Sequence, residues 1–191
     1  MNVSDKLQEI EVSPDNLWIN ENIREKVIVI DGEITSATTI EVYLPLFHYN
    51  RYTSPSGIDN PIRLIINSQG GDLGVALCLA DMVSTSKLWV RSIGLSRVYS
   101  GALLPLIASQ ERQCYAHTEI LVHSPQYEVS MSPIENQTAT HTQMTKLDDC
   151  MWGMIEKYTK IRKRKYIKSV STGIWLTAAE AKKLGVIDRI L

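Results

Sequence analysis

Ile65-Ile66-Asn67-Ser68-Gln69-Gly70-Gly71 decides the fold of this chain, because an apolar run typical of a buried strand ends here in two glycines. Glycine has no Cβ, so bare backbone N–H groups at Gly70 and Gly71 can approach a ligand closely. Directly afterwards, between Leu73 and Val83, apolar residues recur at helical spacing. The stretch therefore predicts a buried strand, a point of close approach and a helix in immediate succession.

Strand-like and helix-like patterns alternate along the rest of the chain. We expect helices over residues 35–50, 73–83, 100–108 and 133–168, and strands at 27–30, 63–66, 88–93, 114–115 and 120–122. A short strand and helix complete the chain, and there Thr177 and Glu180 have the spacing of a capping box. Alternating strands and helices imply a parallel sheet with right-handed crossovers, so the fold class is α/β. Residues 1–22 are polar and mixed, and we expect an N-terminal arm there.

The composition indicates one globular domain spanning residues 1–191. Hydrophobic residues make up 44% and charged residues 21%, values that do not favour a disordered or fibrous chain. The net charge of −1 argues against nucleic acid as the main partner, and the basic cluster within residues 157–168 is expected to be a solvated helix end. No apolar run approaches the roughly 18 residues of a membrane span, and no secretory signal is visible, so we expect a cytoplasmic protein without a membrane partner.

The three cysteines, Cys78, Cys114 and Cys150, are widely spaced and odd in number. This pattern favours buried free thiols in a reducing compartment over a disulfide or a metal site. The histidines have no mutual ligand spacing either, so we expect neither a metal nor another cofactor.

Two further segments contain residues suited to catalysis. Ser100 stands between Tyr99 and Gly101 at the start of an apolar stretch, and His123 follows the apolar run Ile120-Leu121-Val122. With the double glycine they supply a nucleophile, a base and a backbone pocket for a developing oxyanion, which is the inventory of an acyl-transfer enzyme. A nucleotide-binding loop is not favoured, since no Lys-Ser/Thr pair follows the glycines.

Four pieces of the sequence resemble the proteolytic subunit of the Clp protease (ClpP), a family of serine peptidases with a crotonase-like fold. In the family the glycine segment reads INSPGG, the histidine segment IMIHQP, and the last piece is a W/F-L-[ST]-A-x-E-A run that ends in GLID. The pieces here are Ile66–Gly71, the segment around Ser100, Ile120–Pro125, and Trp175–Ala181 with Gly185–Asp188 after it. Their order and spacing extend the resemblance over about residues 16–191.

The resemblance places the nucleophile on Ser100 and its base on His123. Counting without gaps from the double glycine reaches Ser100, and a two-residue deletion in the loop 108–112 then brings His123 into register. Gly71 and Gly101 are the implied oxyanion donors, because the family uses the second glycine and the residue after the serine.

Gly173 stands where the family has its third catalytic residue, an aspartate. That aspartate holds the imidazole tautomer and stabilises the imidazolium, and its loss from a triad costs around 10⁴ in turnover. Three interpretations stay open: orientation of the imidazole by the backbone or a hydroxyl, a carboxylate that reaches in from the long helix, or an inactive site. The hydroxyls would be those of Ser171 and Thr172, and the carboxylates those of Asp148 and Asp149.

Two more departures, Gln69 for proline and Ser96 for glycine, indicate a divergent member of the family. The resemblance implies an ATP-dependent serine peptidase subunit that hydrolyses unfolded polypeptides inside an oligomeric chamber. Its partners would be further copies or paralogues in two stacked seven-membered rings, and an AAA+ unfoldase. The region 133–168 would be a protruding handle at the seam between the rings.

The main alternative is a catalytically weak or inactive structural subunit of a mixed ring, which the missing aspartate favours. Acyl-CoA chemistry on the related crotonase fold is a third alternative, but the chain is short for that class and the serine–histidine pair would be idle there.

Overall fold

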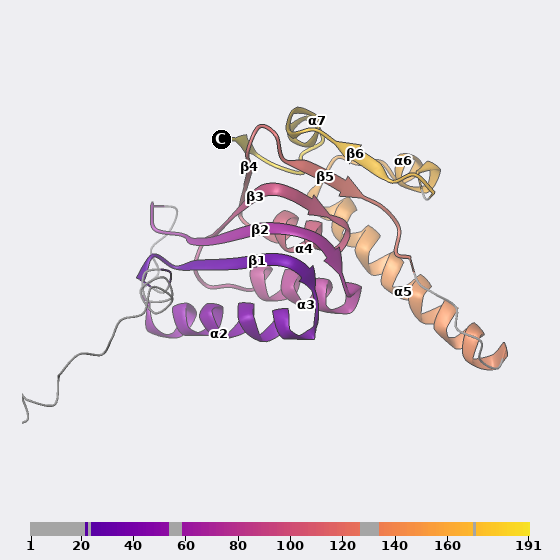
Figure 1. Cartoon of the computed structure of the whole chain (residues 1–191), viewed down its shortest axis with the longest axis horizontal. Helices are drawn as coiled ribbons and strands as arrows, with labels where there is room; N and C mark the ends of the chain where they lie inside the picture. The colour runs from indigo at the N-terminus through magenta and orange to yellow at the C-terminus, as the bar shows by residue number, and fades with distance from the viewer. Residues whose placement is uncertain (1–21, 23, 54–58, 127–133, 170) are drawn as a thin grey trace, which may run out of the picture.

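The computed structural model describes residues 22, 24–53, 59–126, 134–169 and 171–191. The N-terminal arm expected over residues 1–22 lies almost entirely outside the described residues, as does residue 133 at the start of the expected handle. The described chain forms a layer of strands and a layer of helices, with smaller elements beside one edge of the sheet (Figure 1).

A mostly parallel, seven-stranded sheet forms the first layer. Its main path runs β1-β2-β3-β4-β7 with every pair parallel, β5 pairs with the carboxyl half of β3, and β6 joins β5 in the antiparallel direction. The strands are β1 Val27–Ile34, β2 Ile62–Gly71, β3 Val90–Tyr99, β4 Glu111–Cys114, β5 Glu119–Val122, β6 Ile174–Leu176 and β7 Arg189–Ile190. The α/β class expected from the sequence is confirmed.

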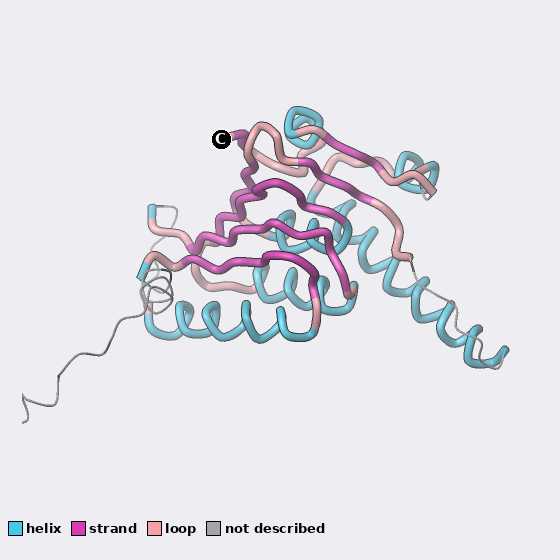
Figure 2. The backbone as a smooth tube through the Cα atoms, in the orientation of Figure 1, coloured by secondary structure: helices cyan, strands magenta, loops and turns pink. Residues whose placement is uncertain are grey.

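Helices cover one face of the sheet, where α2, α3 and α4 lie side by side (Figures 1 and 2). Along β1, Ile28 and Ile30 are buried beneath these helices, whereas Val29 between them is exposed. Every residue of α4 is buried, so this short helix forms the centre of the core. The helices are α2 Ser36–Tyr52, α3 Leu73–Ser84, the 3-10 helix η3 Ser100–Ala102, α4 Leu103–Ala108, α5 Ile134–Tyr158, α6 Lys163–Lys168 and α7 Ala178–Lys183.

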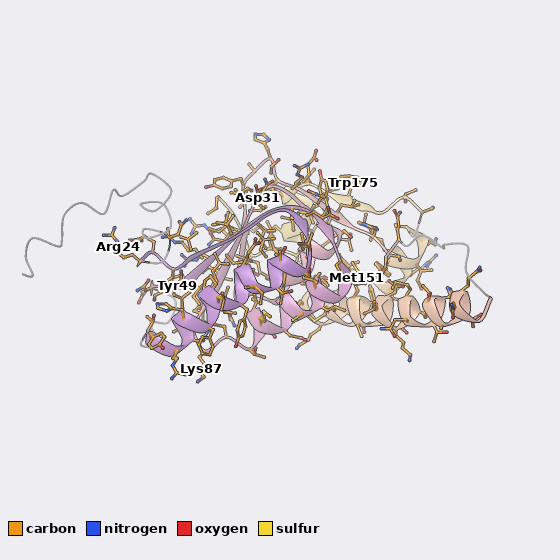
Figure 3. All side chains as sticks on the ribbon, turned by 60° about the horizontal axis from the view of Figure 1, so that its bottom comes forward. Arg24, Asp31, Tyr49, Lys87, Met151 and Trp175 are labelled. Atoms are coloured by element: carbon orange, nitrogen blue, oxygen red, sulfur yellow. The ribbon has the colours of Figure 1, made fainter. Side chains whose placement is uncertain are left out.

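The region 133–168 contains two helices, α5 and α6, which corrects the expectation of one continuous helix. The chain leaves α5 because the amide of Lys160 donates to the carbonyl of Leu184 at 2.7 Å, outside the helix. Met151 is buried in the core, whereas residues 138–143 are exposed. In Figure 3, Met151 lies where α5 meets the helix layer, and the amino-terminal half of α5 projects beyond it.

The cysteines depart from the sequence prediction. All three are free, but only Cys114 is buried, while Cys78 and Cys150 are exposed. Within the described ranges, no group of three or more histidine, cysteine or acidic side chains could hold a metal ion. No helix in the same part of the chain is long and apolar enough to span a bilayer.

Two backbone segments, Gly70-Gly71 at the end of β2 and Ser100-Gly101 after β3, lie against each other with no space for a side chain. A Cβ on Gly70 would lie 2.7 Å from the Ser100 Cβ and 2.7 Å from the Tyr99 carbonyl oxygen. Gly70 also has a φ of +90°, which disfavours any residue with a Cβ. The double glycine is therefore what allows the carboxyl ends of β2 and β3 to meet.

Arg112 in β4 joins the last elements of the chain to the sheet. Its Nη1 donates to the main-chain carbonyls of Tyr158 and Gly185 at 2.8 Å each, and its Nε donates to the Asp188 carboxylate at 3.0 Å. Burial raises the pKa of the Asp188 carboxyl, but the hydrogen bonds from Arg112 outweigh this effect and bring the pKa below its ordinary value.

Gly70→Ala is expected to lower the free energy of unfolding by about 3 kcal/mol, because the new methyl group overlaps main-chain atoms that cannot move away. Urea denaturation followed by circular dichroism measures the change. Gly153→Ala is the control: a Cβ there meets no atom within 4 Å, and helix propensity predicts a gain of roughly 0.5–1 kcal/mol. Equal stability of the two variants would contradict the close approach of the two segments.

Arg112→Met is expected to lower the free energy of unfolding by about 2 kcal/mol at pH 7, because two carbonyls lose their guanidinium donor and the Asp188 carboxylate keeps only the main-chain amide of residue 112. A carboxylate with a depressed folded-state pKa stabilises the fold above its unfolded pKa of about 3.9, and this contribution is lost as the pH falls through the folded pKa. The stability difference from wild type should therefore narrow below about pH 4, as denaturation at several pH values measures.

Arg189→Met is the control for this experiment, because Arg189 is exposed and lies next to Asp188 in the sequence. We expect it to change the free energy of unfolding by less than about 0.5 kcal/mol. A difference between wild type and Arg112→Met that stays constant with pH would rule out the contribution of the carboxylate.

Candidate active site

Ser100 lies at the junction between β3 and η3. Its φ is +54°, a left-handed conformation that is uncommon for a residue with a side chain. Such a conformation persists only where the surrounding structure enforces it, and here the backbone at Gly70 packs directly against Ser100. The first amides of η3, at Ser100 and Gly101, precede its first intrahelical bond, in which the Leu103 amide donates back to the Ser100 carbonyl.

His123 follows β5, the strand that pairs with the carboxyl half of β3. The two strands are parallel, with Tyr99 opposite Leu121, so Ser100 and His123 leave the same edge of the sheet. Both residues line one cavity of about 510 Å³. Its full lining is Gln69, Gly71, Asp72, Leu73, Gly74, Ser100, His123, Pro125, Gln126, Met144, Leu147 and Met151.

The His123 imidazole is half-buried and is held by the main chain. Its Nδ1 lies 2.6 Å from the carbonyl oxygen of Ser124. A carbonyl oxygen only accepts, so this contact is a hydrogen bond when Nδ1 carries the proton, which leaves the Nε2 lone pair free. Among the described residues no hydrogen bond joins the imidazole to the Ser100 hydroxyl, although both line the cavity.

Gly71 and Gly101, the expected oxyanion donors, are neighbours in space. The amide nitrogen of Gly71 lies 3.9 Å from the point that a Cβ on Gly101 would occupy. Gly101 is buried at the start of the η3–α4 segment, where the helix dipole favours negative charge. The two amides are therefore close to each other and to Ser100.

Gly173 lies beside His123 and carries no side chain there. A Cβ at this position would lie 3.5 Å from the His123 Cβ and 2.5 Å from the Leu121 Cδ1, and φ is +69°. Ser171 and Thr172 line a small cavity of about 170 Å³ next to the imidazole. The Thr172 hydroxyl bonds to the carbonyl of Gly173 at 3.3 Å, not to the imidazole.

Neither Asp148 nor Asp149, the two carboxylates of α5 expected as possible partners, bonds to the imidazole. Asp148 accepts a hydrogen bond from the Tyr166 hydroxyl at 2.5 Å, and Asp149 is exposed. Of the three open interpretations, main-chain orientation is the one with a contact present, between His123 and Ser124.

Several cavity residues were not assigned to the site from the sequence. Asp72 caps α3 by accepting from the Val75 amide at 2.9 Å, and an aspartate directly before a helical pattern is a signal that could have been used. Met144 and Leu147 belong to the region expected to form the handle, yet both line the cavity. Their position in the cavity could not be predicted from the sequence, since the placement of α5 depends on tertiary packing.

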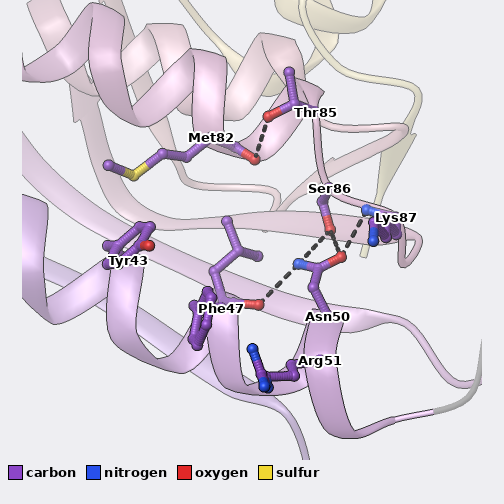
Figure 4. A pocket seen from close by; sticks show the side chains of 9 residues that line it. Tyr43, Phe47, Asn50, Arg51, Met82, Thr85, Ser86 and Lys87 are labelled. Atoms are coloured by element: carbon purple, nitrogen blue, oxygen red, sulfur yellow. Dashed lines mark hydrogen bonds between the residues drawn. The ribbon is translucent and has the colours of Figure 1, made fainter.

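A second cavity, of about 360 Å³, lies between α2 and α3 (Figure 4). Tyr43 and Phe47 stack on its α2 side with ring centroids 5.7 Å apart, and both rings are exposed. The Asn50 side chain closes one end by accepting from the Lys87 amide at 2.6 Å. The exposed apolar surface continues along α2 at Ile40 and Leu44. A contiguous apolar patch of this kind is typical of a protein-binding surface.

Comparison with known proteins agrees with the fold. The Clp protease family model matches residues 15–191. The chain is 26% identical over 173 residues to the ATP-dependent Clp protease proteolytic subunit 1 of Rhodopirellula baltica, covering 88% of this chain and 73% of that protein. It is 32% identical over 137 residues to proteolytic subunit 3 of Rhizobium etli, covering 70% and 69%. It is 21% identical over 193 residues to proteolytic subunit 2 of Treponema denticola, covering 100% and 94%. Because the family model matches nearly the whole length of the chain, the chain belongs to the Clp protease family, as a divergent member.

Proposed function

We propose that the chain is a serine peptidase subunit in which Ser100 and His123 hydrolyse peptide bonds. One observation carries the assignment of these residues: they line a single cavity at which the glycine backbone of residues 71 and 101 also comes together. Membership of the Clp protease family supports a protease subunit at the family level.

In the proposed reaction the Ser100 hydroxyl attacks the peptide carbonyl carbon while Nε2 of His123 takes the hydroxyl proton. The amides of Gly71 and Gly101 would stabilise the negative charge on the carbonyl oxygen. The C–N bond then breaks as the imidazolium protonates the leaving amine, and water cleaves the acyl-enzyme by the same exchange of protons. The Ser124 carbonyl holds Nδ1–H but carries no full charge, so we expect slower turnover than with a carboxylate.

The cavity lining favours an apolar residue next to the scissile bond. Leu73, Met144, Leu147 and Met151 contribute to it, and apolar side chains bind best to such a surface because both partners leave water. We propose unfolded polypeptides as the substrate class, since an extended chain exposes apolar side chains that a folded protein buries.

The assembly we propose is two stacked seven-membered rings that enclose a chamber, built from this chain alone or with paralogues. The projecting half of α5, with its exposed residues 138–143, would lie at the seam between the rings. An AAA+ unfoldase would dock through an apolar segment, and the groove beside Tyr43 and Phe47 is a suitable surface.

The second candidate is a catalytically weak or inactive structural subunit of a mixed ring. It is favoured by Gly173, which leaves the imidazole without a carboxylate partner at that position. Retention of Ser100, His123 and both glycines favours the peptidase.

Labelling with a fluorophosphonate separates the two candidates. We expect the wild type to gain one phosphonyl group, as measured by intact mass, because an activated serine hydroxyl displaces fluoride. Ser100→Ala should abolish labelling and lower hydrolysis of a fluorogenic peptide by at least about 10³-fold. Ser84→Ala is the control, since the Ser84 hydroxyl bonds to a main-chain carbonyl within α3 and lies outside the cavity. Assembled wild type that takes up no label would support the structural subunit.

Gly173→Asp should restore an acidic partner to His123. The new Cβ would start 3.5 Å from the His123 Cβ, and aspartate tolerates the left-handed conformation better than most residues, so only the Leu121 side chain must shift. We expect peptide hydrolysis at least about tenfold faster than in wild type, since a triad aspartate contributes up to about 10⁴.

Gly173→Ala is the matched control for this variant, because it adds the same Cβ without a carboxylate. Rates that are the same for the aspartate and alanine variants would show that position 173 cannot supply the missing group.

A further inference from the structure

The segment that carries His123 contains a feature that the proposed function leaves unexplained. Residues 123–126 follow β5 and belong to no helix or strand, yet the Ser124 carbonyl in this segment accepts the hydrogen bond from the imidazole. A peptide unit outside regular structure needs another constraint if it is to hold an imidazole in one tautomer.

That constraint comes from α5 and α6. Ser124 and Asp148 line the same small cavity, of about 150 Å³, so the segment after β5 lies against α5. The Tyr166 hydroxyl, from α6, donates to the Asp148 carboxylate at 2.5 Å. The Tyr166 ring is 4% exposed and packs on Trp152 of α5 with ring centroids 5.2 Å apart, so the hydroxyl has a defined position.

The charge state of Tyr166 makes it a permanent donor. Burial and the hydrogen bond to Asp148 raise the pKa of the Tyr166 hydroxyl far above its ordinary value, while an interaction with the Ser124 side chain acts in the opposite direction. A tyrosine hydroxyl is already protonated at neutral pH, and the raised pKa keeps it so at alkaline pH as well, while it interacts with Ser124 as well as Asp148.

We propose that Tyr166 and Asp148 are positioning residues for His123: they fix Ser124, whose carbonyl then holds the imidazole with Nδ1 protonated and Nε2 free. This inference rests on the proposed function, because an oriented base matters only if Ser100 is a nucleophile. In this scheme α5 and α6 help to orient the His123 imidazole, which Gly173 cannot do because it has no side chain. Neither side chain touches the substrate in this scheme, since both act through a main-chain carbonyl.

Tyr166→Phe and Asp148→Asn test the inference in the full-length assembled protein. We expect Tyr166→Phe to lower kcat for a fluorogenic peptide about tenfold, with KM within about twofold, because orientation of the base affects the transition state and not substrate binding. Asp148→Asn should lower kcat by about threefold to tenfold on the same reasoning, and since Asp148 is only half-buried we expect this variant to fold as the wild type does.

The readout that a purely structural role would not change is the tautomer of His123. Solid-state 15N NMR of histidine-labelled protein, assigned by comparison with His123→Ala, should show Nδ1 protonated in the wild type. Both variants should show a mixture of tautomers. Tyr158→Phe and Asp149→Asn are the matched controls: neither side chain lies in this network, and both variants should keep the wild-type kcat and tautomer.

Unchanged kcat and an unchanged tautomer in Tyr166→Phe and Asp148→Asn would overturn the inference. A wild type that takes no fluorophosphonate label would instead overturn the proposed function, and the NMR measurement would still report whether Tyr166 and Asp148 set the tautomer of His123 through Ser124.

Discussion

The close approach of two backbone segments is the constraint on which the site depends. At the carboxyl ends of β2 and β3 the chain packs main chain against main chain, and a Cβ on Gly70 would overlap both Ser100 and the Tyr99 carbonyl. Because no side chain separates the segments, the amides of residues 71 and 101 come near Ser100. This packing also enforces the left-handed φ of Ser100.

The parallel pairing of β3 with β5 brings His123 to the cavity that Ser100 lines. Since β3 and β5 run in the same direction and are in register, the residues after them leave the sheet at one edge, and His123 lines the same cavity as Ser100. The antiparallel strand β6 then returns along β5, with Val122 opposite Ile174, which places Gly173 next to the imidazole. The topology thus places the backbone of Gly173 beside the His123 imidazole, where a side chain would reach the imidazole only if Leu121 shifted.

Much of the fold could be predicted because local signals agreed with the tertiary structure. The Thr177–Glu180 capping box forms as expected, and helix α2 spans nearly the predicted residues. The split between α5 and α6 could not be predicted, because it depends on a hydrogen bond from Lys160 to the distant carbonyl of Leu184. The hydrogen bond from His123 to the Ser124 carbonyl could not be predicted either, since every residue has such a carbonyl and only its position in space distinguishes it.

By itself the sequence determined the α/β class, the family and the residue types available for catalysis, because apolar periodicity, glycines and motif order are local properties. Tertiary structure decided what surrounds these residues: Ser100 and His123 line one cavity, the imidazole bonds to a main-chain carbonyl, and Asp148 bonds to Tyr166 in place of the imidazole. The physical reason is that hydrogen bonds and steric exclusion act over a few ångströms in space, between residues whose separation along the chain carries no information about that distance.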